Sequence, residues 1–313
     1  TFYRGGPILC SAISGIEMAL WDIKGKYYNM PVFERLGGAY RDKVRMYGHL
    51  KPTGHPGDFP IPHMLKITDK RLADGFTVMK YSIIPPIRPI DNMEMVDKVV
   101  ERFAAVRERA GKKVDIAIDF HGRVSPAMSI RLLKALEPYY PLFVEEPVLP
   151  ENVDEMVRVS RSTTIPIAAG ERLFTKFGFR ELIEKQAVSV VQPDLCHCGG
   201  IFEARKIAAM AETYYMQIAP HNPLGPISLA ACMQLDACVP NLLAQEHPGM
   251  PDHADLGVGI LKTPFKIEDG YIRIPEGPGL GIEVDESKLD ALRFDGTWDT
   301  PHLEFEDGSI ADW

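Results

Sequence analysis

Six polar residues recur at a nearly constant interval between positions 114 and 248, and this period is the strongest constraint on the fold. Each one ends or closely follows a short apolar run, as in V-D-I-A-I-D. The six residues are Asp119, Glu145, Glu171, Asp194, His221 and Glu246. The steps between them are 26, 26, 23, 27 and 25 residues. A parallel strand of about five residues, a helix of about ten to fifteen and two short loops fill such an interval. The period therefore predicts repeated βα units.

Two further strand candidates precede the six periodic runs. They are V-R-M-Y-G-H-L at 44–50 and F-T-V-M-K-Y-S at 76–82. Eight parallel strands are enough to close a sheet into a barrel that its own side chains fill. The sequence therefore predicts an α/β protein with a TIM-type (β/α)7β barrel over residues 44–250.

Apolar residues at helical spacing fall before and between the predicted strands. The helices that we expect cover 10–28, 32–36, 67–74, 92–110, 125–137, 152–162, 176–184, 201–213 and 226–237. A Pro/Gly-rich loop at 52–62 is longer than ordinary βα loops, so we expect it to overhang the carboxyl ends of the strands. After Pro248 the period stops. Short strands are expected there at 265–268, 271–274 and 281–285, in a segment that packs back on the amino-terminal helices.

Asp119, Glu145 and Glu171 end three consecutive predicted strands. The carboxyl ends of barrel strands meet on one face, where barrel enzymes hold their chemistry. Three carboxylates brought together there repel one another unless a cation joins them. Oxygen ligands without Cys or His suit Mg²⁺, so we expect a magnesium site. Taken singly, a carboxylate at a strand end is more often a helix cap or a surface group.

A choice of one residue arises at Glu145-Glu146, because neighbouring strand residues point to opposite faces. We favour Glu145, which follows Val144 at the end of the strand. The same alternation puts Asp119 and His121 on one face, so His121 is expected beside the metal.

His221 and Asp194 end neighbouring predicted strands, so their side chains are expected to be adjacent. A carboxylate beside an imidazole fixes its tautomer and raises its basicity. His221 is therefore a candidate general base, and the alternative is a core histidine bonded to a backbone carbonyl. Glu246 either hydrogen-bonds negative charge that develops on a substrate or holds a neighbouring residue. With a metal to bind a substrate carboxylate, this set fits proton removal next to that carboxylate, which begins both racemisation and β-elimination.

The charge and cysteine content limit the partners and the location. A formal net charge of −8 without Lys/Arg runs argues against nucleic acid as the principal partner. No run approaches the length of a membrane span, so no membrane partner is expected. The five cysteines lack C-x-x-C spacing and no secretory signal stands at the start, which favours the cytoplasm. A soft-metal site at C-H-C, 196–198, is the less favoured alternative to a plain loop.

Motifs along most of the chain are similar to those of the mandelate racemase branch of the enolase superfamily. They are F-Y-R-G-G-P-I-L at 2–9, A-L-W-D-I-K-G-K at 19–26, D-F-H-G-R-V-S at 119–125, L-F-V-E-E-P-V-L at 142–149, A-A-G-E-R at 168–172, Q-P-D-L at 192–195, G-G-I at 199–201, A-P-H-N-P-L-G-P-I at 219–227 and D-G-S-I-A-D-W at the end. The D-F-H part is the most specific. Within that branch the chain resembles the acid-sugar dehydratases.

The resemblance implies a metal site and a base. Asp119, Glu145 and Glu171 are implied to bind Mg²⁺. His221, oriented by Asp194, is implied to take the proton from C2 of a small-molecule sugar acid. The product expected is a 2-keto-3-deoxy acid, formed from D-galactonate, with D-gluconate or another aldonate as the alternative substrate.

The resemblance also implies an acid and substrate contacts. His121 protonates the leaving 3-hydroxyl, and Glu246 hydrogen-bonds the carboxylate of the intermediate. Lys80 and Asn222 are the expected substrate-binding residues. Relatives that racemise or lactonise carry K-x-K on the second strand, whereas Ser82 stands at the second position here, which favours elimination.

The same family has a capping domain, of which the sequence carries only a part. We expect a helical remnant of the cap at 1–43, the catalytic barrel at 44–250, and a segment at 251–313 that completes an α+β cap. Roughly the first 70 residues of a family cap precede what is present here, and T-F-Y-R-G-G-P reads as a truncated start. A non-catalytic barrel that serves as a binding or structural subunit is therefore the alternative of another class. Family members are commonly homo-oligomers, so the resemblance implies a homo-oligomer.

Overall fold

The computed structural model describes residues 5–49, 60–82, 84–249, 251–293, 296 and 303–311. The chain forms two compact units. One comprises Thr1–Tyr47, Gly170–Glu184 and Val191–Gly296, and is called the first unit. The second unit comprises Gly48–Ala169, Lys185–Val190 and Thr297–Trp313. Of the predicted overhanging loop, positions 52–59 lie outside the described residues, so that prediction stays untested.

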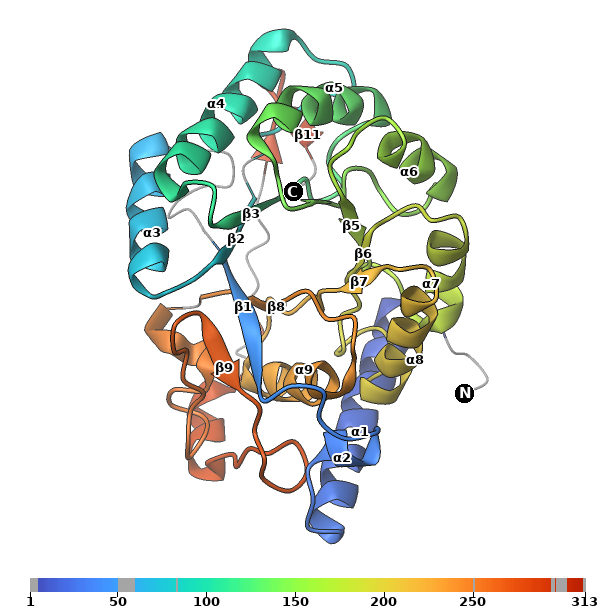
Figure 1. Ribbon diagram of the computed structural model, residues 1–313, viewed down its shortest axis with the longest axis vertical. Helices are drawn as coiled ribbons and strands as arrows, with labels where there is room; N and C mark the ends of the chain where they lie inside the picture. Colours follow the sequence, from blue (N-terminus) through green and yellow to red (C-terminus); the bar gives the residue numbers. More distant parts are fainter. Residues whose placement is uncertain are drawn as a thin grey trace. The chain divides into compact units, whose positions relative to one another are not determined.

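The second unit is built on four parallel strands that pair in chain order. They are β2 (Val78–Tyr81), β3 (Asp115–Asp119), β4 (Val144–Glu145) and β5 (Ile167–Ala169). In Figure 1 the helices α3 (Ile61–Ala73), α4 (Met93–Ala110), α5 (Pro126–Leu136) and α6 (Val153–Ser160) lie on the outer side of these strands. The unit also holds a short 3₁₀ helix, Glu137–Tyr139, and the strand pair β10 (Leu303–Glu304) and β11 (Ile310–Ala311). The alternation of strand and helix is the predicted βα repeat.

The first unit continues that repeat. Its elements are α1 (Gly6–Tyr27), α2 (Val32–Arg35), α7 (Thr175–Glu184), α8 (Ile201–Glu212), β7 (Gln217–Ile218), α9 (Pro226–Cys238), β8 (Gln245–His247), β9 (Tyr271–Arg273) and the 3₁₀ helices Pro251–Leu256 and Glu286–Leu292. Strands β1 (Lys43–His49) and β6 (Val190–Val191) each have residues in both units. Strand β6 pairs with β7, and β8 pairs with β1. All eight strands predicted for the βα repeat are therefore present.

Helices α4, α5 and α6 each begin after a residue whose side chain caps them, and this explains why each starts one position later than predicted. Asn92 accepts a hydrogen bond from Met95 N, Ser125 from Met128 N, and Asn152 from Glu155 N. Each of these residues precedes its helix by one position because an N-cap residue lies outside the helical backbone. Helix α4 then buries Val96, Val99, Phe103 and Val106 at helical spacing.

Two helices begin several residues earlier than predicted, and two predicted strands are wrong. Helix α1 begins at Gly6 rather than at 10. Helix α3 begins at Ile61 rather than at 67, because Pro62 stands in its first turn, where no amide hydrogen is needed. The strands predicted at 265–268 and 281–285 were wrong. Among the described residues of these stretches only isolated bridges occur, Glu268 with Tyr271 and Leu261 with Val284. Gly and Pro between 275 and 281 interrupt the extended backbone that longer strands need.

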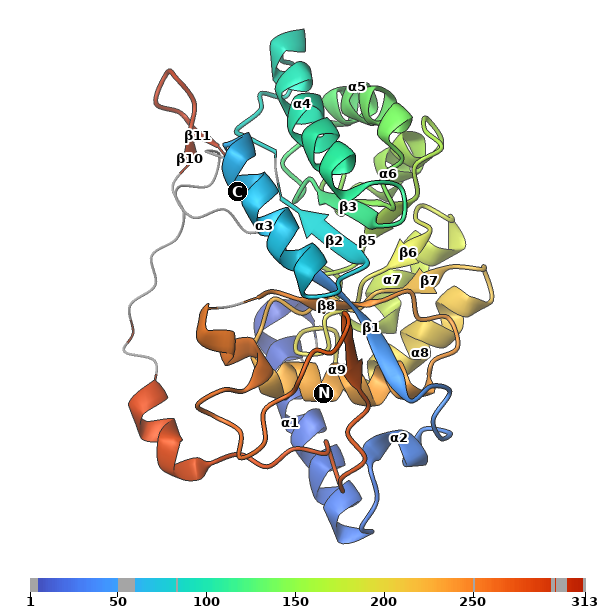
Figure 2. The same cartoon turned by 60° about the vertical axis from the view of Figure 1, so that its left-hand side comes forward.

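The segment after β8 contacts the amino-terminal helices and β1 within the first unit. Strand β9 pairs antiparallel with β1, side by side in Figure 2. Val32 N donates to Gly279 O over 3.0 Å, and Gly279 N donates to Met30 O over 3.0 Å. A Cβ added to Gly25 would lie 2.5 Å from the Cα of Gly279. Glycine at 25 is therefore required by the close approach of two backbones.

Helix α1 is, within the described part of the chain, the one helix long and apolar enough to cross a membrane by length and composition alone. The helix also has a face that packs inside the first unit, with Cys10, Ser14, Met18 and Gly25 buried. Such a helix is weak support for a membrane span, since core helices of soluble proteins have the same composition. The expectation of no membrane partner stays a prediction.

A buried carboxyl group in α9 generates a prediction about stability. Asp236 is fully buried, and within the described residues neither side-chain oxygen has a hydrogen-bond partner. Burial raises the pKa of Asp236 well above its ordinary value, against a smaller lowering by the charge of Arg41. The folded protein therefore keeps this proton at pH values where the unfolded chain, with a pKa near about 3.9, has released it.

We expect Asp236→Asn to be more stable than the wild type at neutral pH. Above about pH 4, and up to the folded pKa, the wild type loses about 1.4 kcal/mol of unfolding free energy per pH unit, whereas asparagine has no proton to lose. Urea unfolding at pH 5 and pH 7 measures the difference. Asp97→Asn, on the exposed face of α4, controls for the loss of one negative charge. A destabilisation of Asp236→Asn that is equal at both pH values would contradict the prediction.

Candidate active site

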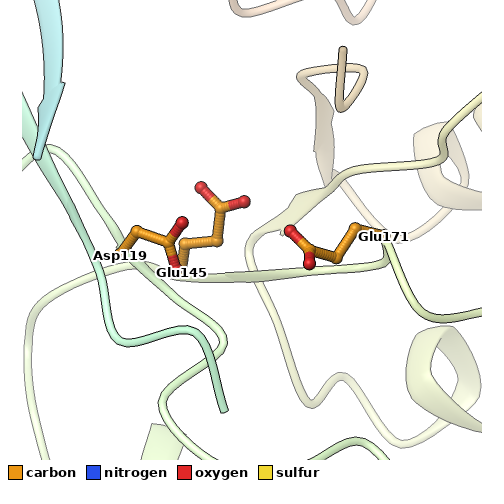
Figure 3. Close-up of side chains that lie close together, drawn as sticks. All are labelled: Asp119, Glu145 and Glu171. Atoms are coloured by element: carbon orange, nitrogen blue, oxygen red, sulfur yellow. The ribbon is translucent and has the colours of Figure 1, made fainter. Parts of the chain in front are cut away.

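Asp119 and Glu145 are the last residues of neighbouring parallel strands in the second unit. Strands β3 and β4 pair with Asp119 opposite Glu145. Both side chains are buried, with Asp119 5% exposed and Glu145 fully buried. Figure 3 shows their carboxylates side by side. Because β3 and β4 end at paired residues, two negative charges lie next to each other, as the sequence period predicted.

Lys80 supplies a positive charge to these two carboxylates. Its Nζ lies 2.7 Å from Glu145 Oε2 and 3.6 Å from Asp119 Oδ2, and its side chain is 3% exposed. The register of β2 and β3 explains this, because Lys80 pairs with Ala117 two residues before Asp119 and so points to the same face. The ammonium group thus offsets the repulsion between the carboxylates. The prediction that Lys80 binds substrate is not tested by this contact.

His121 lies next to Asp119, but not for the reason expected from strand alternation. Strand β3 ends at Asp119, and His121 has a φ of 58°, in the left-handed region. Its backbone N–H donates to Asp119 Oδ1 over 2.8 Å. Glu146 likewise leaves the strand, with a φ of 39°. The chain therefore turns sharply after each carboxylate, and each turn ends the alternation on which the prediction relied.

In the first unit, His221 lies between two carboxylates. Its Nδ1 is 2.8 Å from Asp194 Oδ2, and its Nε2 is 3.3 Å from Glu171 Oε2. Asp194 and His221 form a parallel bridge just beyond β6 and β7, so the two side chains are lateral neighbours as predicted. The Nδ1 atom donates to Asp194, which leaves Nε2 as the nitrogen that exchanges a proton with other groups.

The charges around His221 change its pKa strongly. Burial lowers the pKa, but the carboxylates of Glu171, Glu246 and Asp194 outweigh burial and raise it to about 10. Glu171 makes the largest of the raising contributions. A cation held by Glu171 would neutralise that charge and so lower the pKa of His221.

Glu246 and Asn222 are also brought together in the first unit. Asn222 N donates to Glu246 Oε2 over 2.5 Å, and both residues are buried. Of the two roles considered for Glu246, this contact is the one that holds a neighbouring residue. The next residue, His247, lies 2.8 Å from the buried Asp255 through Nδ1, a pair that the sequence analysis did not identify.

Two further residues contact the site carboxylates of the first unit. His197 Nε2 lies 3.9 Å from Asp194 Oδ2, and Arg172 Nε lies 3.8 Å from Glu171 Oε1. The sequence analysis gave neither of them a role beside these carboxylates. It considered His197 only as part of the C-H-C run at 196–198, and Arg172 only as part of the A-A-G-E-R motif.

The three predicted metal ligands all carry carboxylates, two in the second unit and one in the first. Asp119, Glu145 and Glu171 each offer a carboxylate oxygen (Figure 3). Hard oxygen donors without sulfur or imidazole suit Mg²⁺, Ca²⁺ or Mn²⁺. The donor chemistry therefore fits a divalent cation.

Comparisons with known proteins give the family. The model "Enolase C-terminal domain-like" matches residues 64–288, and the model "Mandelate racemase / muconate lactonizing enzyme, N-terminal domain" matches residues 1–37. The D-galactonate dehydratase of Ralstonia pickettii (strain 12J) is 46% identical over 100% of this chain and 81% of that protein. The D-galactonate dehydratase of Variovorax paradoxus (strain S110) is 44% identical with the same coverage.

A solved structure supports the same assignment. The mandelate racemase/muconate lactonizing enzyme from Sulfitobacter sp. matches with a TM-score of 0.88 at 37% identity, over 99% of this chain and 78% of that chain. The expected α/β fold with a TIM-type barrel is thereby confirmed. The chain belongs to the mandelate racemase/muconate lactonizing enzyme family of the enolase superfamily.

Proposed function

We propose that this chain is a hydro-lyase that dehydrates an aldonic acid, converting D-galactonate to 2-dehydro-3-deoxy-D-galactonate. The observation that carries the proposal is the His221–Asp194 pair, with Nδ1 of the imidazole fixed at 2.8 Å and Nε2 directed to Glu171. The relatives named D-galactonate dehydratase, at 44% and 46% identity over the whole chain, support the substrate.

The reaction needs a base and an acid, and the chain offers a histidine for each. His221 Nε2 takes the proton from C2, and Asp194 stabilises the imidazolium that forms. His121 donates a proton to the 3-hydroxyl, which leaves as water. The resulting enol tautomerises to the 2-keto acid, so that one water is lost and no oxidant is required.

The carboxylates that end the strands would hold the metal. Asp119, Glu145 and Glu171 are the proposed Mg²⁺ ligands. When bound, Mg²⁺ stabilises the negative charge that develops on the substrate carboxylate as the proton leaves. The Nζ of Lys80 lies close to the carboxylates of Asp119 and Glu145. We propose that Lys80 and Asn222 contact the substrate. Glu246 would hydrogen-bond the substrate carboxylate while fixing the backbone of Asn222.

The proposal extends to organisation and location. We assign residues 1–43 to the helical part of a capping domain, 44–250 to the catalytic barrel, and 251–313 to the segment that completes the cap. The family resemblance supports a homo-oligomer, a small-molecule partner and no role for nucleic acid or membrane. All five cysteines are free thiols, which fits the reducing cytoplasm.

The substrate assignment predicts selective formation of a 2-keto acid. Incubated with Mg²⁺ and single aldonates, the protein is expected to give product from D-galactonate, and a semicarbazide or coupled-enzyme assay would detect it. D-Gluconate serves as the comparison. If D-gluconate is turned over and D-galactonate is not, the protein is a dehydratase with a different substrate. If no aldonate is turned over, the proposed function is wrong.

The two histidines are expected to differ in proton exchange at C2. His221→Ala removes the base, so incorporation of deuterium at C2 from deuterated water should fall by about a hundredfold or more. His121→Ala should retain part of that exchange but lose dehydration, because the leaving hydroxyl is no longer protonated. Nuclear magnetic resonance of recovered substrate measures both. Wild-type exchange in His221→Ala would mean that another group is the base.

Metal binding can be tested against the adjacent carboxylate. Glu145→Gln removes a charged ligand, so calorimetric titration should show Mg²⁺ affinity weakened by about tenfold or more. Glu146→Gln is the matched control, since Glu146 is also buried and differs by one position along the chain. If Glu146→Gln loses Mg²⁺ affinity and Glu145→Gln keeps the wild-type value, the metal ligand is Glu146 and not Glu145.

A further inference from the structure

Three polar side chains on one face of α1 hold the segment that follows β6 in the first unit. Ser11 Oγ lies 2.8 Å from His197 Nδ1, and Ser14 Oγ accepts from Gly199 N over 2.9 Å. Glu17 accepts from Ile201 N over 2.8 Å and from Phe202 N over 2.9 Å. Because residues three apart lie on the same helix face, these side chains form one continuous contact.

Glu17 does for α8 what a local cap does for other helices. The residue before α8 is Gly200, which has no side chain to accept from the first amides. The carboxylate of Glu17 accepts from two of these amides and adds a negative charge where the helix dipole favours one. Gly200 has a φ of 93°, and a Cβ there would overlap the Glu17 carboxylate. The glycine is therefore what admits Glu17 to the helix end.

The same segment is tied directly to Asp194. The backbone O of Asp194 accepts from His197 N over 3.0 Å and from Cys198 N over 2.7 Å. Its side-chain Oδ1 accepts from Cys196 N over 2.7 Å, while Oδ2 holds His221. A shift of residues 197–200 must therefore move the aspartate that orients the imidazole.

We propose that Ser11, Ser14 and Glu17 of α1, with His197, are positioning residues that fix Asp194 behind His221. Ser11 Oγ donates to Pro7 O, so it accepts from the Nδ1–H of His197 and anchors that side chain to the helix. Their proposed role involves no contact with the substrate. We call the contacts of Ser11, Ser14 and Glu17 with residues 197–202 the clamp. Its proposed purpose is to support proton abstraction by His221, so this proposal rests on the proposed function.

The first test measures the clamp without using activity. Residue-resolved amide hydrogen exchange is compared in wild type, Ser14→Ala and Glu17→Gln, at Cys196 and Cys198. The acceptors of these two amides belong to Asp194 and not to α1, so local loss of a bond to the helix does not change them directly. We expect exchange there to rise by about tenfold, the effect of about one lost hydrogen bond. Ser160→Ala is the control, because that hydroxyl donates to Val157 O of its own helix.

The second test measures the consequence for the reaction. In the same full-length variants kcat should fall by about ten- to a hundredfold with KM within about twofold, since a small displacement of the base slows the chemical step more than binding. His197→Asn retains a donor near the position of Nδ1 and should keep kcat within about threefold of wild type. His197→Phe removes that donor and should lower kcat as Ser14→Ala does.

The outcomes separate the clamp from the proposed function. If amide exchange at Cys196 and Cys198 is the same in the variants as in the wild type, the clamp is wrong. The clamp is also wrong if exchange rises in the variants while their kcat stays at the wild-type value. A wild type that dehydrates no aldonate overturns the proposed function, while the exchange measurement still decides whether α1 holds Asp194. Ser11→Ala, at a part-exposed position, repeats both tests if the buried Ser14→Ala fails to fold.

Discussion

The burial of like charges is the constraint on which this structure depends. Asp119 and Glu145 end adjacent strands with almost no exposure to solvent. Two such charges about 4 Å apart repel by about 4 kcal/mol at an effective dielectric constant near 20. The structure tolerates them because Lys80 approaches both. A site that binds a divalent cation must keep its carboxylates ready in this way, and the ammonium group is a partner that a cation can replace or supplement.

A second constraint is the orientation of the histidine. A carboxylate that accepts from one imidazole nitrogen sets the tautomer and the orientation of the ring, and Asp194 does this at Nδ1 of His221. The aspartate is in turn held by three backbone amides of the turn that follows it. Helix α1, near the amino terminus of the described chain, contacts the end of that turn. The contacts that hold His221 thus extend from Asp194 to a helix near the amino terminus of the described chain.

Much of the fold could be predicted because its signal is local and repeated. Buried parallel strands read as apolar runs, and each of these runs closes on a polar residue, which is why Asp119, Glu145, Glu171, Asp194, His221 and Glu246 could be predicted together as site candidates. Of the three strands predicted after Pro248, only the one at 271–274 is present, as β9. The other two were wrong because apolar residues between glycine and proline allow turns as well as strands. His121 was placed by an alternation that the backbone abandons at Asp119. The contact of Ser11 with His197 joins residues 186 positions apart, and no periodic pattern links them.

The meeting of Gly25 with Gly279 has a consequence for how this protein can change. Two main chains touch there without a side chain between them, and Gly279 also needs its positive φ of 72°. Exposed positions of a helix accept many residue types, whereas the buried position 25 has room for no side chain larger than the hydrogen atom of glycine. A single methyl group at position 25 would overlap the backbone of Gly279, so α1 and the last segment of the first unit could not keep this contact.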